Sequence, residues 1–128
     1  MFGAMQKGAI AATVAAVCLS LASALPAASA ELVMFVQQGC VWCARWDSEI
    51  APAYPNTDQG RLAPLRRVDI DAPLPPDLEG IAVERFTPTF VLVEDGAEIA
   101  RMRGYAGDQF FWFLLDEMLA KLEDGVAR

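Results

Sequence analysis

Histidine is absent from this chain of 128 residues, and cysteine occurs only three times. Without histidine, hydrolases that depend on a Ser-His or Cys-His pair are excluded. A zinc site needs about four Cys, His or carboxylate ligands, so the small number of cysteines argues against a metal centre. No Gly-rich phosphate-binding loop is present either, and we expect no organic cofactor.

Positive charge is also scarce. Ten Lys and Arg residues stand against seventeen Asp and Glu residues, which gives a formal net charge of −7. An acidic protein is repelled by anionic phosphate surfaces, so we do not expect nucleic acid to be a partner.

The first 30 residues have the pattern of a secretory signal peptide. Lys7 is the only charged residue among them, residues 8–25 are rich in Ala, Val and Leu, and Ala28-Ser29-Ala30 follows. A basic start, an apolar middle and a small-x-small end predict cleavage after Ala30. An uncleaved membrane anchor is the alternative, because a spanning helix needs about 20 residues and the apolar stretch is nearly that long. Pro26 and the small residues after it favour cleavage.

Cleavage would remove Cys18 and leave residues 31–128 as one small domain. The mature chain would then have two cysteines and no stable insertion in a membrane. A signal peptide and a two-cysteine mature chain agree with an oxidising compartment outside the cytoplasm.

The two remaining cysteines form a CxxC motif, Gly39-Cys40-Val41-Trp42-Cys43, between an apolar strand and a predicted helix. This spacing at a helix start keeps both sulfurs within bonding distance and sets the first thiol at the positive end of the helix dipole. The context favours dithiol–disulfide redox chemistry. A structural disulfide and a metal-binding pair are the alternatives.

Hydrophobic periodicity and turn residues predict the other elements. We expect strands over residues 31–37, 65–70, 89–93 and 98–103, helices over about 40–51, 77–84 and 108–123, turns over 56–64, and an Asp-Gly hairpin turn over 94–97. In the first helix, Cys43, Trp46 and Ile50 share one face, which we expect to be buried while Cys40 stays accessible. Asp108 is expected to be the N-cap of the last helix.

The last helix has an apolar stripe that we expect to lie in the core. Its members are Phe111, Leu114, Leu115, Met118, Leu119 and Leu122. Three further aromatic residues, Phe110, Trp112 and Phe113, extend the apolar surface beyond one face, so one of them is a candidate for exposure to a partner.

The order of these elements resembles the thioredoxin family. The resemblance is carried by the CxxC helix, by a second strand ending in Val68-Asp69-Ile70-Asp71, by Phe86-Thr87-Pro88-Thr89-Phe90, and by the closing hairpin and helix. It implies an α/β thioredoxin-like fold with a compact, glutaredoxin-sized, four-stranded mixed sheet. The family's usual N-terminal strand and helix are missing. Within the family, the chain is most similar to the small periplasmic thioredoxins found with the Sox thiosulfate-oxidation system, which implies a periplasmic location.

The resemblance also implies roles for individual residues. Cys40 matches the attacking cysteine and Cys43 the resolving cysteine. Pro88 matches the cis-proline, and the backbone of Thr87 before it pairs with a bound substrate strand. Four further positions are implied to contact the substrate: Val41 and Trp42 between the cysteines, and Gly104 and Tyr105 in the loop that closes the other side of the groove.

Departures from the family lie close to the motif. Thioredoxins usually have Trp before the first cysteine, Gly-Pro between the two, and a buried aspartate six residues upstream. Here those positions hold Gly39, Val41-Trp42 and Met34. Without the aspartate, the proton of Cys43 must pass to water or another base. Arg67 falls where the family often has a lysine.

We therefore expect a periplasmic thiol–disulfide oxidoreductase that reduces a disulfide or mixed disulfide in a partner protein, with the Sox sulfur-carrier protein as one candidate. A membrane thiol-reductant donor is the implied second partner. A disulfide oxidase or isomerase is the first alternative, because direction depends on redox potential. Others are a Cu(I) chaperone that holds the ion between Cys40 and Cys43, and a binding module with a permanent disulfide.

Overall fold

The computed structural model describes Gly3 and residues 29–126. The predicted signal segment therefore lies almost wholly outside the described residues, and its cleavage stays a prediction. None of the helices within the described part of the chain is long and apolar enough to cross a membrane.

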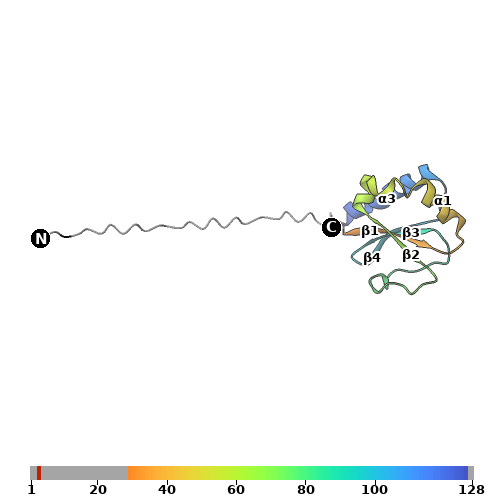
Figure 1. The fold of residues 1–128 in the computed structure, drawn as a ribbon, viewed down its shortest axis with the longest axis horizontal. Helices are drawn as coiled ribbons and strands as arrows, with labels where there is room; N and C mark the ends of the chain where they lie inside the picture. Colours follow the sequence, from red (N-terminus) through yellow and green to blue (C-terminus); the bar gives the residue numbers. More distant parts are fainter. Residues whose placement is uncertain (1–2, 4–28, 127–128) are drawn as a thin grey trace.

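Strand β1 (Ala30–Val36) lies at the centre of a four-stranded mixed sheet with the order β2-β1-β3-β4 (Figure 1). Strand β2 (Leu65–Asp69) runs parallel to β1, and β3 (Thr89–Glu94) pairs antiparallel on its other side. Strand β4 (Ala97–Arg103) forms the edge, antiparallel to β3. Both faces of β1 are covered, which is why its apolar run is nearly continuous. The predicted α/β fold class is confirmed.

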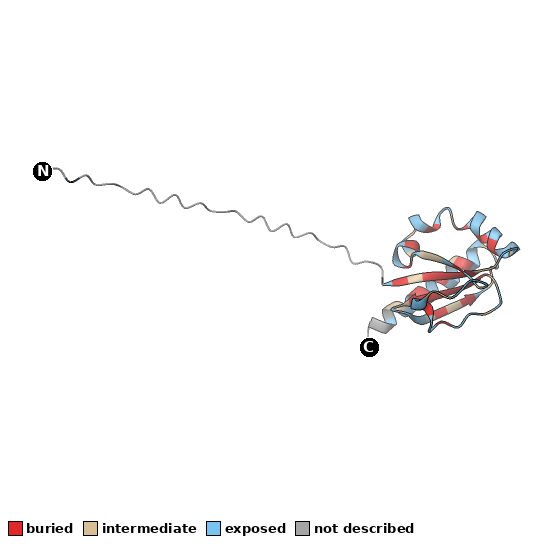
Figure 2. Ribbon diagram, turned by 60° about the horizontal axis from the view of Figure 1, so that its bottom comes forward, coloured by how far each residue is buried: buried red, intermediate tan, exposed pale blue. Residues whose placement is uncertain are grey.

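Helices α1 (Val41–Glu49) and α3 (Asp108–Val126) lie on one face of the sheet. The connection between β2 and β3, with the 3-10 helix η2 (Pro76–Leu78), covers the other face. Each side has its own apolar core, one around Trp46, Phe90 and Phe111 and the other around Phe35, Leu78 and Val91. Figure 2 shows the buried residues concentrated on the strands and on the inward faces of the helices.

The segment predicted to form turns, residues 56–64, contains regular structure. A 3-10 helix η1 (Tyr54–Asn56) leads into a short helix α2 (Asp58–Leu62). The hydroxyl of Thr57 accepts a hydrogen bond from the Gly60 N–H at 3.0 Å and caps α2. A five-residue helix is too short to show hydrophobic periodicity, so only this cap could have indicated it.

The helix predicted over residues 77–84 is wrong beyond its first turn, because only η2 forms there. Leu78 and Ile81 both turn into the second core. The Ala82 carbonyl accepts from the Arg101 guanidinium at 2.9 Å instead of from a helical amide, and Gly80 is a poor helix former.

Two details of α3 also differ from the prediction. The Gly107 carbonyl accepts the first helical bond, from the Phe111 N–H at 3.0 Å, so Asp108 is the first helical residue and not the N-cap. Leu114 is exposed, whereas Phe111, Leu115, Met118 and Leu119 of the same stripe are buried and Leu122 is half-buried. Phe110 and Phe113 are exposed as well.

Candidate active site

The two cysteines of the CxxC motif form a disulfide at the start of α1, with their Cα atoms 5.2 Å apart. Cys40 is the N-cap of this helix, and its Sγ accepts a hydrogen bond from the Cys43 N–H at 3.1 Å. Cys40 is half-buried and Cys43 is buried, which confirms the predicted difference in exposure. Gly39 turns the chain from β1 into α1 with a φ of +77°, a value that suits glycine.

The sheet brings a second segment to the same end as the disulfide. β1 leads toward the motif, and Phe35 near its end lies opposite Thr89, the first residue of β3. The Thr87–Pro88 peptide bond just before β3 is cis. The Pro88 carbonyl accepts from the Gly104 N–H at 2.7 Å. Thr87, Pro88 and Gly104 are thus brought together, although they come from two distant parts of the sequence.

Tyr105 ties the loop after β4 to helix α1. Its side chain is buried, and its hydroxyl donates a hydrogen bond to the carboxylate of Glu49. Arg45 Nε binds the same carboxylate at 2.8 Å. The Arg45 guanidinium lies 5.6 Å from the centre of the Trp42 ring and 5.9 Å from that of Tyr105. Trp42 is 51% exposed beside the disulfide.

These contacts shift the ionisation of all three polar groups. The hydrogen bond from Arg45, followed by that from Tyr105, holds the pKa of Glu49 below its usual value. Burial and then the bond to Glu49 raise the pKa of the Tyr105 phenol, and the Glu49 carboxylate raises the pKa of Arg45. Glu49 and Arg45 are therefore a charged pair, and Tyr105 is a neutral donor, throughout the physiological range.

Met34 is fully buried in the same core cluster as Cys43. The position where the family usually has a carboxylate is thus apolar here. Arg67, at the position of the family's lysine, binds Asp47 of α1 at 2.7 Å, and its guanidinium lies 5.9 Å from the centre of the Trp46 ring. This arginine serves to join β2 to α1.

A scan against family models and a search of curated proteins gave no match to the chain. A search of solved structures did. The periplasmic thioredoxin SoxS from Paracoccus pantotrophus, in its reduced form, is 49% identical, with a TM-score of 0.70, over 73% of this chain and 98% of that one. This chain belongs to the thioredoxin family.

Other neighbours of this thioredoxin show the fold alone. A thioredoxin-like protein of Edwardsiella tarda is 22% identical with a TM-score of 0.55, over 69% of this chain and 82% of that one. Thioredoxin-2 of the malaria parasite is 18% identical with a TM-score of 0.52, over 70% of this chain and 82% of that one. Family membership and the CxxC disulfide make the protein a thiol–disulfide oxidoreductase.

Sequence reasoning missed several residues near the disulfide of this thioredoxin. Glu49 and Arg45 were not singled out, although their spacing of four on a helix predicts an ion pair. Phe86 is an exposed aromatic residue just before Thr87, and the Arg103 guanidinium lies 4.9 Å from the centre of its ring. The sequence offered one indication of this contact, which is the aromatic residue directly before Thr87-Pro88.

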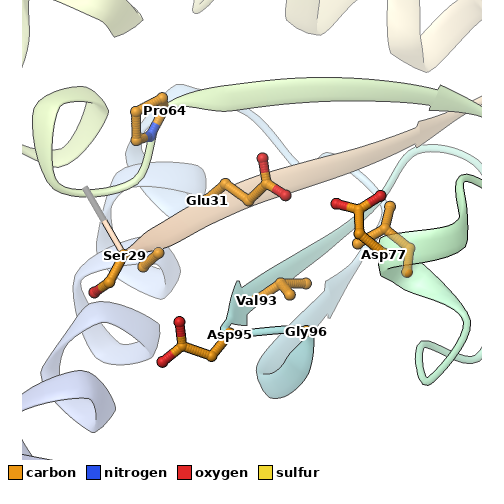
Figure 3. A pocket seen from close by; sticks show the side chains of 9 residues that line it. Ser29, Glu31, Pro64, Asp77, Val93, Asp95 and Gly96 are labelled. Carbon is orange, nitrogen blue, oxygen red and sulfur yellow. The ribbon is translucent and has the colours of Figure 1, made fainter. Parts of the chain in front are cut away.

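A cleft lies at the opposite end of the sheet, between the start of β1 and the β3–β4 turn (Figure 3). Figure 3 shows the carboxylates of Glu31 and Asp77 on its wall, and Arg66 binds them at 3.0 and 2.6 Å. Neither cysteine lines this cleft. Over residues 29–126, no group of three or more Cys, Asp or Glu side chains has the arrangement of a metal site.

Proposed function

We propose that this thioredoxin is a periplasmic reductase of protein disulfides, with Cys40 as the attacking and Cys43 as the resolving cysteine. The observation that carries the proposal is the position of the disulfide. Cys40 caps α1 and is the more exposed sulfur, at the end of the sheet where the cis peptide before Pro88 also lies. The 49% identity to a periplasmic thioredoxin supports the location, as does the predicted signal peptide of residues 1–30.

The reaction begins with the reduced dithiol. The N-terminus of α1 and the Cys43 N–H favour a thiolate at Cys40 Sγ. This thiolate attacks one sulfur of the partner's disulfide, and the other sulfur leaves as a thiolate. Cys43 then gives up its proton and attacks Cys40 Sγ, which releases the second partner thiol. The protein is left with the Cys40–Cys43 disulfide, the state that the structure shows, and the partner has gained two electrons.

Met34 affects how Cys43 loses its proton before it attacks Cys40 Sγ. Because this buried residue has no carboxylate, the proton of Cys43 leaves to water or to the departing partner thiolate.

The partner's chain is held beside the disulfide. Thr87 and Pro88 offer backbone to an extended segment, and Gly104 and Tyr105 lie next to them through the Gly104–Pro88 hydrogen bond. On the other side, Val41 and Trp42 are exposed. A segment bound here presents its sulfur to Cys40, the outer cysteine.

The resemblance to the Sox-associated thioredoxins supports the Sox sulfur-carrier protein as the partner, and a membrane thiol-reductant donor as the source of electrons. A disulfide oxidase would use the same residues in the opposite direction, and an isomerase would use them without net transfer of electrons. The direction of electron transfer depends on the redox potential, which the Val41-Trp42 pair between the cysteines tunes.

The test is to trap the mixed disulfide. Cys43→Ser, exported in the native host, keeps the attacking sulfur and lacks the resolving one. We expect a discrete adduct on non-reducing gels, with the partner identified by mass spectrometry. Cys40→Ser/Cys43→Ser is the matched control and should give no adduct. A sulfur-carrier protein in the adduct would support the Sox role, and a different partner would overturn that part alone. No adduct, together with no reduction of insulin by the wild-type dithiol, would overturn the reductase.

A further inference from the structure

Phe86 is a large apolar side chain that remains 48% exposed at the end of the sheet where the disulfide lies. It precedes Thr87 and the cis peptide bond directly. The second core, which the rest of this connection covers, is built from Leu78, Ile81 and their neighbours and does not include Phe86. Its ring therefore has no evident role in holding the core together.

Three contacts nevertheless fix this residue in place. Its carbonyl accepts a hydrogen bond from the buried Thr89 hydroxyl at 2.6 Å, which closes the turn around Pro88. The Arg103 guanidinium lies 4.9 Å from the centre of the ring. Gly104 lies against the ring edge, where a Cβ would come within 3.3 Å of Phe86 Cε1. A ring fixed in position and half exposed loses little conformational freedom when a partner covers it.

The charges beside this ring are already compensated. Arg103 Nε binds Glu84 at 2.6 Å, and Arg45, which lies near the Trp42 and Tyr105 rings, binds Glu49 at 2.8 Å. An acidic partner residue would have to compete with these carboxylates. Three apolar side chains are exposed at this end of the sheet: Phe86 before the cis peptide, and Val41 and Trp42 between the cysteines. This chemistry fits an apolar side chain.

We propose that Phe86 determines substrate specificity by contacting an aromatic or long aliphatic side chain of the partner, within three residues of the cysteine that Cys40 attacks. The inference rests on the proposed function, because it needs a partner strand beside Thr87. A strand paired with the Thr87 backbone places a neighbouring side chain over residue 86. The chemistry at the two sulfurs is unchanged, since Phe86 contributes contact area and no proton or electron.

The test uses disulfide-linked homodimers of a seven-residue Gly/Ser peptide with a central cysteine. One Phe is moved through the six flanking positions, and the all-Gly/Ser peptide is the reference. Second-order rates of reduction are measured by acid quench and chromatography. Aromatic pairs contribute about 0.5–1.5 kcal/mol beyond buried area, so we expect the wild type to prefer Phe about three- to tenfold at one or two positions.

Phe86→Ala should reduce this preference to within about twofold, and Phe86→Leu should retain part of it, as expected for a contact of this size. Both variants should reduce bis(2-hydroxyethyl) disulfide, which is too small to reach residue 86, at the wild-type rate. Val83→Ala is the matched control, because Val83 is a 40% exposed apolar residue of the same connection. It should leave the preference intact.

The inference is overturned if the wild type does not prefer Phe-containing peptides, or if Phe86→Ala keeps that preference. In either case, reduction of the reference peptide by the wild type would still support the proposed function. Equal slowing of Phe86→Ala on peptides and on the small disulfide also overturns it, because Phe86 would then support the dithiol itself. Failure of the wild type on every disulfide would instead overturn the proposed function.

Discussion

At the scale of single residues, Gly60 shows how closely the segments before β2 are packed. A Cβ built on Gly60 would lie 1.9 Å from the Tyr54 carbonyl oxygen, so only glycine allows α2 to approach η1. The Tyr54 ring is buried in the core beside α1, and its hydroxyl donates to the Ala63 carbonyl at 2.7 Å. The glycine thus permits a backbone approach that positions a core aromatic residue.

Gly60→Ala should lower the free energy of unfolding by about 3 kcal/mol, at the upper end of the overpacking range, because the clash is with backbone that cannot rotate away. Urea titration followed by circular dichroism measures the loss. Gly80→Ala is the control, since a Cβ there meets its nearest atom, the Gly96 carbonyl oxygen, at 3.4 Å. Equal urea midpoints for the two variants would show that α2 can shift to accept the added methyl group, and that the close approach at Gly60 does not limit stability.

At the scale of elements, helix α1 and the loop of residues 104–107 are joined by one carboxylate. Glu49, at the end of α1, accepts from both Tyr105 and Arg45. The pKa of Glu49 is lowered in the folded protein, first by Arg45 and then by Tyr105. A lowered folded-state pKa stabilises the protein above the unfolded-state value, near 4.5, and this stabilisation is lost as the pH falls through the folded-state pKa.

Glu49→Gln should therefore lower the melting temperature by a few degrees at pH 7, and the difference from wild type should shrink as the pH falls below about 4. Thermal melts from pH 7 to pH 3 measure the difference, and the other carboxylates cancel because both proteins contain them. Glu117→Gln, at an exposed position of α3, controls for the loss of a surface charge. A difference that stayed constant across this range would show that the charge of Glu49 has no part in the link.

Long or sharply bounded elements were predictable from sequence. The four strands, α1 and α3 have strong apolar patterns or an Asp-Gly turn, and each was placed to within a few residues. Helix α2 was missed because five residues are too few to show hydrophobic periodicity. Its formation depends instead on the Thr57 cap and on the close approach that Gly60 allows. The predicted helix over residues 77–84 does not form beyond its first turn, because tertiary contacts of Leu78, Ile81 and Arg101 outweigh local helix propensity.

The same distinction holds for the candidate site. The disulfide and its exposed first sulfur follow from local spacing at a helix start, so the sequence was sufficient for them. The Tyr105–Glu49 link and the Phe86–Arg103 contact join residues far apart in the chain. The first depends on how α1 packs against the loop after β4, and the second depends on the register that sets Arg103 opposite Thr89, and a local pattern contains neither.

At the scale of the whole molecule, the sheet begins at the predicted cleavage site. Ala30 is the first residue of β1, where it is buried and pairs with Glu94, and Ser29 Oγ donates to the same glutamate at 3.2 Å. Of the contacts within β1 and its pairing, cleavage after Ala30 would remove the Ala30–Glu94 pairing and the Ser29 hydrogen bond. The buried run of residues 32–35, which pairs with both β2 and β3, would remain whole.

We therefore expect the protein expressed with its native N-terminus to be recovered from the periplasm with Glu31 as its first residue, as determined by N-terminal sequencing and intact mass. Ala28→Phe is the matched control: it places a bulky residue at the third position before the cleavage site and leaves residues 31–128 unchanged. This variant should keep its full mass and stay with the membrane fraction. A wild-type protein that also kept its full uncleaved mass and stayed with the membrane fraction would show that the apolar segment serves as an anchor. The oxidoreductase would then act while tethered to the membrane.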